Sequence, residues 1–208
     1  DKVDLVSVCT PATTHYDIVS SALERGLHVL VEKPLASSSR LGRELVRKAR
    51  ENNLVLQVGH IERFNGAFQA VVPLIKQPKF IEVHRLSTFT ARGIDVSVAV
   101  DLMIHDLDLV LSLLKGSTLT ECRSSGAGLL TDSADIVNAR LEFDNGCVAN
   151  LTASRVSREP MRKMRIFQKD LYLSLNLREK TVEAFAARKD IDIEQADRDP
   201  LSFIRPLD

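Results

Sequence analysis

The stretch GLHVLVEKP, residues Gly26–Pro34, decides the class of fold. It contains a short strand, Leu27–Val31, that ends in Glu32-Lys33-Pro34. The apolar run Val3–Cys9 precedes it, almost without polar alternation, which is typical of a buried parallel strand. LVLQVG, Leu54–Gly59, follows as a third strand. The patterns between the strands predict helices from Thr13 or Thr14 to Arg25 and from Ser37–Ser39 to about Asn52. The alternation of strands and helices predicts right-handed crossovers and a parallel sheet.

Ligands of such sheets bind beyond the carboxyl ends of the strands. Three segments lie there: Cys9-Thr10-Pro11, Glu32-Lys33-Pro34 and His60–Asn65. Lys33 is the most informative residue, because Pro34 biases its backbone towards extended conformations and so limits the direction of its side chain. Lys33 can therefore face a ligand at the edge of the sheet. A lysine at this place can also simply end the strand in solvent, and the residues of the turn alone leave both interpretations open.

A second stretch, Val98–Leu114 or VAVDLMIHDLDLVLSLL, predicts a helix that is apolar almost all round. At about 100° per residue its ionisable side chains form one narrow stripe, and Asp106 lies off it. The stripe consists of Asp101, His105, Asp108 and Ser112. An aspartate four residues before a histidine can fix the imidazole tautomer and raise its basicity. The alternative is that the stripe only meets water.

The remaining sequence predicts an α+β domain with a mostly antiparallel sheet. Arg63–Lys76 is expected to be mostly helical, with Pro73 kinking or ending the helix. Asp144-Asn145-Gly146 predicts a tight hairpin turn. The expected strands are Phe80–Phe89, Thr118–Gly126, Ile136–Phe143, Cys147–Ser154, Lys163–Gln168, Leu171–Leu175 and Thr181–Ala184.

Composition excludes several classes of function. The formal net charge is +0, which gives no support to a nucleic-acid or membrane-surface role. No apolar run approaches the roughly 20 residues of a membrane-spanning helix. The three cysteines, Cys9, Cys122 and Cys147, show no metal-ligand spacing and favour a reduced, cytoplasmic compartment. We expect no metal, no nucleic-acid partner and no membrane.

Several motifs together resemble the Gfo/Idh/MocA (glucose–fructose oxidoreductase / inositol dehydrogenase) family of oxidoreductases. They stand in the family's order along the chain: Cys9-Thr10-Pro11, His15, Gly26–Leu35 with its Glu-Lys-Pro triplet, Gly59–Asn65 and Asp101-x-x-x-His105. The family's Gly-rich phosphate loop is missing, so we expect the chain to begin at the family's fourth strand. About two strand–helix units of ~30 residues each would then be absent from its N-terminus.

The resemblance implies residues 1–60 as a partial Rossmann-type NAD(P)-binding domain and residues 61–208 as a substrate and oligomerisation domain with an open-faced sheet. It implies Lys33, His105 and Asp101 as catalytic residues. His105 would take the hydroxyl proton, Asp101 would orient it, and Lys33 would stabilise the reacting oxygen. The implied cofactor is NAD or NADP, with NAD favoured. Its expected contacts are Cys9, Thr10, Pro11, His15, Glu32, Lys33 and Pro34, and those of the substrate are Arg63, Asn65, Arg92, Asp101 and His105.

Within the family, VGHIERFN and DLMIHDLDLVLSLL are most similar to bacterial enzymes that oxidise C-3 of UDP-N-acetylhexosamines, such as UDP-N-acetylglucosamine 3-dehydrogenases. A homodimer or homotetramer through the open sheet face is expected. A free polyol or hexose as substrate, or a non-catalytic binding module, are the alternatives. A basic cluster can seat a diphosphate or form a solvated strand edge. It comprises Arg155, Arg158, Arg162, Lys163 and Arg165, with Arg85 and Arg92 as similar candidates.

Overall fold

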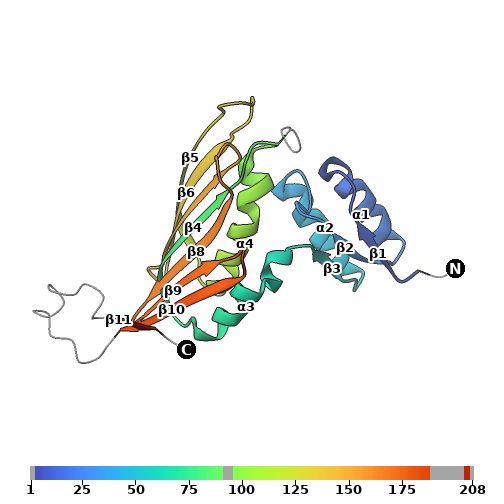
Figure 1. Ribbon diagram of the computed structural model, residues 1–208. Helices are drawn as coiled ribbons and strands as arrows, with labels where there is room; N and C mark the ends of the chain where they lie inside the picture. The colour runs from blue at the N-terminus through green and yellow to red at the C-terminus, as the bar shows by residue number, and fades with distance from the viewer. Residues whose placement is uncertain (1–2, 91–95, 188–203, 207–208) are drawn as a thin grey trace, which may run out of the picture. The chain divides into compact units, whose positions relative to one another are not determined.

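The protein divides into two compact units, Asp1–Ile61 and Glu62–Asp208. A computed structural model describes residues 3–90, 96–187 and 204–206 (Figure 1). In the described residues, no helix is long and apolar enough to span a membrane. The first unit carries a parallel sheet and the second a much larger, mostly antiparallel one, which confirms the predicted fold class.

The first unit is a three-stranded parallel sheet with two crossover helices. Strands β1 (Leu5–Val8), β2 (His28–Val31) and β3 (Leu56–Val58) lie in the order β1-β2-β3. A 3-10 turn, Ala12–Thr14, leads into α1 (His15–Glu24), and α2 is Ser39–Glu51. Helices and sheet enclose a small apolar core that includes Val19, Leu23, Val29, Val31 and Leu45.

Local chemistry explains where these helices begin and end. Ser38 caps α2, because its hydroxyl oxygen accepts a hydrogen bond from the amide of Leu41 at 3.3 Å. Gly26 follows α1 with φ of +76°, a left-handed conformation that glycine adopts without strain. Both signals were present in the sequence, and both helices lie where the sequence predicts them.

The second unit is built on an eight-stranded sheet in the order β11-β10-β9-β8-β4-β7-β6-β5. Only β4 and β7 pair in parallel among its described strands. The strands are β4 (Pro78–Leu86), β5 (Leu119–Ala127), β6 (Ile136–Phe143), β7 (Val148–Ser154), β8 (Met161–Gln168), β9 (Leu171–Asn176), β10 (Thr181–Ala187) and β11 (Ile204–Pro206).

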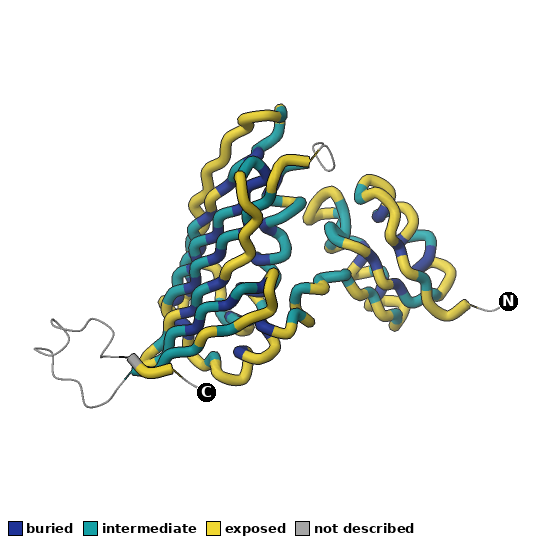
Figure 2. Tube along the Cα trace, in the orientation of Figure 1, coloured by how far each residue is buried: buried dark blue, intermediate teal, exposed yellow. Residues whose placement is uncertain are grey.

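One face of this sheet packs against helices and the other face carries none in the described part of the chain (Figure 1). Helix α3 (Gly66–Val71) contacts β9 and β10, and α4 (Ile104–Leu113) contacts β4 and β7. Buried and less buried residues alternate along the strands, as Figure 2 shows, because alternate side chains point to opposite faces. The predicted hairpin is also present: Gly146 has φ of +77°, and Asn145 Oδ1 accepts from the amide of Cys147 at 2.9 Å.

Two helix predictions need correction. The expected helix Arg63–Lys76 is divided into the 3-10 turn Ile61–Phe64, α3, and the 3-10 turn Val72–Leu74. Asn65 has an extended backbone, and its side chain accepts from the amide of Ala67, so a new helix starts there. The expected helix Val98–Leu114 begins with a π-helical turn, Ala99–Met103, before α4. In addition, the strand expected over Phe80–Phe89 ends at Leu86.

A buried carboxylate fixes the residues that lead into the π-helical turn. Asp135 Oδ2 accepts from the amides of Leu130, Leu129 and Thr131 at 2.6–2.9 Å, and these donors hold the pKa of Asp135 far below its usual range. Arg155 Nε lies 3.5 Å from Asp135 Oδ1, and its guanidinium also donates to the carbonyl of Val96. The strands β6 and β7 therefore anchor the start of the helical segment.

We predict that the three cysteines differ sharply in reactivity. Cys9 and Cys122 are exposed, whereas Cys147 is 0% exposed, and burial raises the pKa of its thiol to about 11. A thiolate is the reactive form, so native protein at pH 8 should be alkylated at Cys9 and Cys122 and spared at Cys147. Mass spectrometry of the cysteine peptides, before and after unfolding in guanidinium, measures this. Native labelling of Cys147 at the rate of Cys122 would contradict the packing described for β7.

Candidate functional site

The carboxyl edge of the three-stranded sheet gathers the predicted cofactor residues of the first unit. The amide of Glu32 donates to the carbonyl of Val8 at 2.9 Å, and the amide of Gly59 donates to the carbonyl of Val31 at 2.8 Å. These bonds hold the ends of β1, β2 and β3 in line. The turns Cys9–Pro11 and Glu32–Pro34 therefore leave the sheet side by side, as the sequence predicts.

His15, the first residue of α1, bridges the two turns. Its ring is 1% exposed, with Nδ1 2.7 Å from the carbonyl oxygen of Pro34 and Nε2 2.9 Å from that of Thr10. Thr14 strengthens the first turn, since its hydroxyl donates to the carbonyl of Pro11 or to Thr10 Oγ1, both at 2.8 Å. Both ring nitrogens of His15 thus face backbone carbonyls. His15 therefore bridges the two turns and fixes their shape.

Lys33 and Glu32 occupy the middle turn. Lys33 is half-buried and is followed by a cis peptide bond to Pro34, whereas Glu32 is exposed. The Glu32 carboxylate packs over Gly59, where an added Cβ would lie only 3.3 Å from Oε1. Glycine at position 59 therefore allows the carboxylate to lie close to the end of β3. The sequence predicted both residues at this edge, but gave no sign of the close approach between Glu32 and Gly59.

In the second unit, the π-helical turn and α4 carry the other predicted catalytic residues. Asp101 lies in the turn and His105 in the first turn of α4, and both are half-buried. Ser97 starts the segment: its hydroxyl oxygen accepts from the amide of Ala99 at 3.2 Å. A π-helical turn spans one residue more per hydrogen bond than an α-helix. The helical wheel that grouped Asp101 with His105 is therefore valid only from Ile104 onwards.

Asp106, which lay off the predicted stripe, forms a deeply buried ion pair. Its side chain is buried and accepts two hydrogen bonds from Arg85 on β4, at 2.9 Å from Nε and 2.7 Å from Nη2. Glu62 Oε1 lies 3.3 Å from Arg85 Nη1 and 3.5 Å from Arg162 Nη1. Burial raises the pKa of Asp106, and the bonds from Arg85 offset only part of that rise. The network ties α4 to β4, in the middle of the sheet.

Arg63 and Asn65, predicted as substrate contacts, have structural partners. Arg63 donates from Nε and Nη2 to the two oxygens of Asp108, both at 2.6 Å. Asn65 caps α3, and its amide group donates to the carbonyl of Leu177 at 2.8 Å. The expected stripe of α4 is therefore partly closed by protein, because Asp108 is occupied by Arg63. Arg92, the other predicted substrate contact, lies outside the described residues.

The expected basic cluster does not form one site. Arg155 is 5% exposed and belongs to the Asp135 network. Arg162 lies opposite Arg85 on the helix-facing side of the sheet, whereas Lys163 and Arg165 pair with His84 and Glu82 on the open side. Because side chains alternate along β8, residues next to each other in the sequence point to opposite faces of the sheet. Within the described residues, no group of three metal-ligating side chains comes together.

Comparisons with known proteins agree with the fold. The family model "Oxidoreductase family, NAD-binding Rossmann fold" matches residues 1–60, and the "GFO/IDH/MocA C-terminal domain" matches residues 57–170. The chain therefore combines a Rossmann-type sheet with the C-terminal domain of one class of oxidoreductases. It belongs to the Gfo/Idh/MocA family.

Two curated relatives are similar in sequence. UDP-N-acetylglucosamine 3-dehydrogenase of Acidithiobacillus ferrooxidans is 42% identical over 185 residues, which are 88% of this chain and 59% of that protein. A scyllo-inositol 2-dehydrogenase (NAD(+)) of Bacillus subtilis is 30% identical over 74% of this chain and 49% of that protein. The chain thus spans about half to three-fifths of the length of these relatives.

Solved structures show the same architecture. A structure of the Acidithiobacillus ferrooxidans enzyme superposes with a TM-score of 0.87 at 38% identity, over 99% of this chain and 63% of that chain. An inositol dehydrogenase homolog from Azotobacter vinelandii, complexed with NADH and myo-inositol, superposes with a TM-score of 0.80 at 19% identity, over 99% and 56%. The second likeness concerns the fold alone.

We predict that the Arg85–Asp106 pair contributes more to stability than the Arg63–Asp108 pair. Asp106→Asn removes the carboxylate that accepts two hydrogen bonds from a buried guanidinium and leaves it only the 3.3 Å contact with Glu62, which should cost about 3 kcal/mol or more of the free energy of unfolding. Arg63 is 49% exposed but Asp108 is only 10% exposed, so Arg63→Ala should cost less than Asp106→Asn, about 1–3 kcal/mol. Urea unfolding followed by circular dichroism compares them. Equal losses in the two variants would show that the buried pair does not hold α4.

Proposed function

We propose that the protein is an NAD(P)-dependent dehydrogenase that oxidises a secondary hydroxyl of a sugar, the C-3 hydroxyl of a UDP-N-acetylhexosamine. The observation that carries the proposal is the pairing of two features in one chain: Lys33 at the carboxyl edge of a parallel sheet, and His105 with Asp101 on a helix anchored to the second sheet. The 42% identity to UDP-N-acetylglucosamine 3-dehydrogenase supports the choice of substrate.

The first unit suits the nicotinamide side of a dinucleotide. Ligands of doubly wound sheets bind at the carboxyl edge, where Cys9, Thr10, Pro11, Glu32, Lys33 and Pro34 lie. The bonds of His15 to the carbonyls of Thr10 and Pro34 hold this edge in one shape. When bound, the nicotinamide supplies the hydride acceptor. We favour NAD over NADP, as in the scyllo-inositol 2-dehydrogenase (NAD(+)) relative.

The residues of the chain then handle the proton. His105 takes the proton of the substrate hydroxyl, since an imidazole titrates near working pH. Lys33 donates a hydrogen bond to the same oxygen and stabilises the negative charge that develops there. Asp101 orients His105. The alcohol would become a ketone: His105 receives the hydroxyl proton, and a bound nicotinamide would supply the acceptor for the carbon-bound hydride. Arg63, Asn65 and Arg92 would lie around the sugar.

The test uses the complete gene product that contains these 208 residues. NADH formation is followed with UDP-N-acetylglucosamine and with NAD or NADP. His105→Ala and Lys33→Ala should each lower turnover at least ~100-fold, the usual size of general acid–base catalysis. Lys115→Ala, at an exposed lysine after α4, should leave turnover unchanged. Near-full activity of either catalytic variant would overturn the assignment.

The same assay distinguishes the proposed function from its alternatives. Activity with myo-inositol or glucose, and none with UDP-sugars, would favour a free polyol or hexose dehydrogenase. NAD binding without any turnover would favour a non-catalytic binding module. We place the protein in the cytoplasm, because its three cysteines are free thiols, as suits a reducing compartment.

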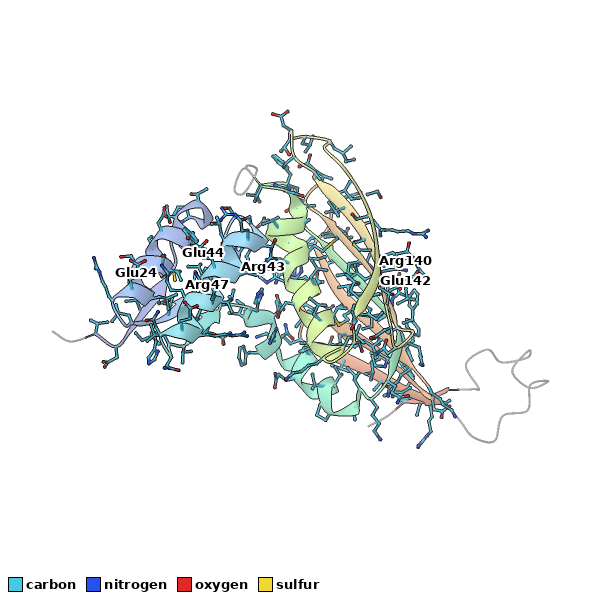
Figure 3. All side chains as sticks on the ribbon, turned by 180° about the vertical axis from the view of Figure 1, so that it is seen from behind. Glu24, Arg43, Glu44, Arg47, Arg140 and Glu142 are labelled. Atoms are coloured by element: carbon cyan, nitrogen blue, oxygen red, sulfur yellow. The ribbon has the colours of Figure 1, made fainter. Side chains whose placement is uncertain are left out.

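We also propose a homodimer or homotetramer through the open face of the large sheet. Four aromatic rings form a row there, one each on β4, β8, β9 and β10. They belong to Phe80, Phe167, Tyr172 and Phe185, and the centroids of neighbouring rings lie 4.9–6.1 Å apart. Phe167 is 37% exposed in the single chain. A second copy would bury this row and the charged pairs beside it, such as Arg140 with Glu142 (Figure 3).

The oligomer is predicted to depend on the aromatic row. Phe167→Glu should convert the protein to a single-chain species in sedimentation velocity, because the carboxylate would be buried without a partner. Val72→Glu is the matched control, since Val72 is 41% exposed and lies in the 3-10 turn after α3. A wild-type monomer, or an unchanged oligomer in Phe167→Glu, would overturn this interface.

A further inference from the structure

A cavity of about 350 Å³ lies wholly within the second unit, beside the π-helical turn. Its charged lining consists of Arg85, Arg162 and Arg178, and no acidic side chain lines it in the described part of the chain. Leu102, Ser87 and Pro160 complete most of the wall. Leu102 is adjacent to Asp101 and three residues before His105, so the cavity adjoins the element that carries the proposed catalytic pair.

Two of these arginines form an arrangement that is unfavourable for folding. Arg85 and Arg162 lie directly opposite each other on β4 and β8, and like charges at such positions destabilise a sheet. Arg85 is neutralised by Asp106 behind it. For Arg162, the acidic neighbour is Glu62, at 3.5 Å, which also lies 3.3 Å from Arg85. Glu62 thus lies between two guanidinium groups, and both of its contacts are longer than a good charge-assisted hydrogen bond, so its carboxylate holds Arg162 only loosely.

Arg178 adds a second loosely held guanidinium. It follows β9, and its contacts to the carbonyl of Pro160 and to Glu179 are both 3.5 Å long. The side chains of Arg162 and Arg178 are each 50% exposed. Contacts of this length are weak compared with the 2.7–2.9 Å of good charge-assisted hydrogen bonds. Both groups can therefore turn to an incoming ligand at little cost.

We propose that this cavity is the subsite for the diphosphate of a nucleotide-linked substrate, held by Arg162 and Arg178. The inference rests on the proposed function and deepens it. Planar guanidinium forks match phosphate oxygens, and the buried pair Arg85–Asp106 forms a rigid floor. A diphosphate would offer Arg162 shorter contacts than the 3.5 Å that separates it from Glu62. The nucleotide would thereby be anchored away from the reacting atoms, while the sugar extends towards the helix of His105.

The experiment measures binding directly, without turnover. UDP is titrated into the complete gene product by calorimetry, and NAD is titrated separately, because its diphosphate is the other possible source of the same chemistry. Replacing both arginines (R162A/R178A) should raise the Kd for UDP at least about ten-fold, as expected for lost hydrogen bonds to a charged group. The Kd for NAD should stay the same. Arg47→Ala, at an exposed arginine paired with Glu51 on α2, is the control (Figure 3).

Folding of the variant is checked by its melting temperature. R162A removes one of two opposed like charges, so it should melt no lower than wild type. In the active enzyme, R162A/R178A should raise KM for a UDP-sugar about ten-fold with kcat nearly unchanged, because these groups bind the substrate away from the reacting atoms. An unchanged KM would overturn the subsite.

The outcomes separate this inference from the proposed reaction. If UDP binding depends on the two arginines but no NADH forms, the subsite is supported and the proposed dehydrogenase activity is contradicted. NADH formation from UDP-sugars with equal UDP affinity in all variants keeps the dehydrogenase and overturns the subsite. Loss of NAD affinity alone, or no UDP binding by wild type, overturns the subsite as well.

Discussion

A buried charged side chain needs an oppositely charged partner, and this constraint determines how α4 packs on the large sheet. Arg85 projects from the middle of the large sheet, and Asp106 projects from α4 to meet it with two hydrogen bonds. The helix is otherwise apolar towards the sheet, through residues such as Leu109 and Val110. Apolar packing is not directional, whereas a two-bond ion pair is. The pair therefore sets the rotation of α4 and its distance from the sheet, and with them the place of His105, the residue before Asp106.

The first unit holds its irregular turns with side chains of α1 and of the turn before it. A parallel sheet leaves irregular turns at its carboxyl edge, where backbone carbonyls need partners. His15 supplies both ring nitrogens to two of these turns from beneath, and Thr14 adds a hydroxyl. Gly59 leaves room for the Glu32 carboxylate beside the next strand. In both units, a side chain from a helix fixes the element that carries a proposed catalytic residue.

Patterns of the sequence were enough for the elements, because strands and hairpins depend on local alternation. Ile136–Phe143 was predicted with its observed bounds, and the parallel order of the first sheet followed from three apolar runs. The site was harder. Asp106 looked like an exception to the helical stripe, since its partner Arg85 is distant in sequence and only sheet pairing brings them together. The π-helical turn was also missed, because no residue type in Ala99–Met103 distinguishes it from an α-helix. Family resemblance, rather than spacing alone, is what selected Lys33 and His105.

The opposed arginines show how function can appear as a local inconsistency. A sequence optimised for stability alone would place an opposite charge or an apolar residue across from Arg85, as the pairing of Glu82 with Arg165 does on the other face of the same strands. The chain instead places Arg162 there and leaves Glu62 to serve both. Natural proteins break such local rules mainly where a ligand or a reaction requires it. A bound anion would offset the repulsion between the two opposed arginines, so the three guanidinium groups around one cavity are an argument for an anionic ligand there.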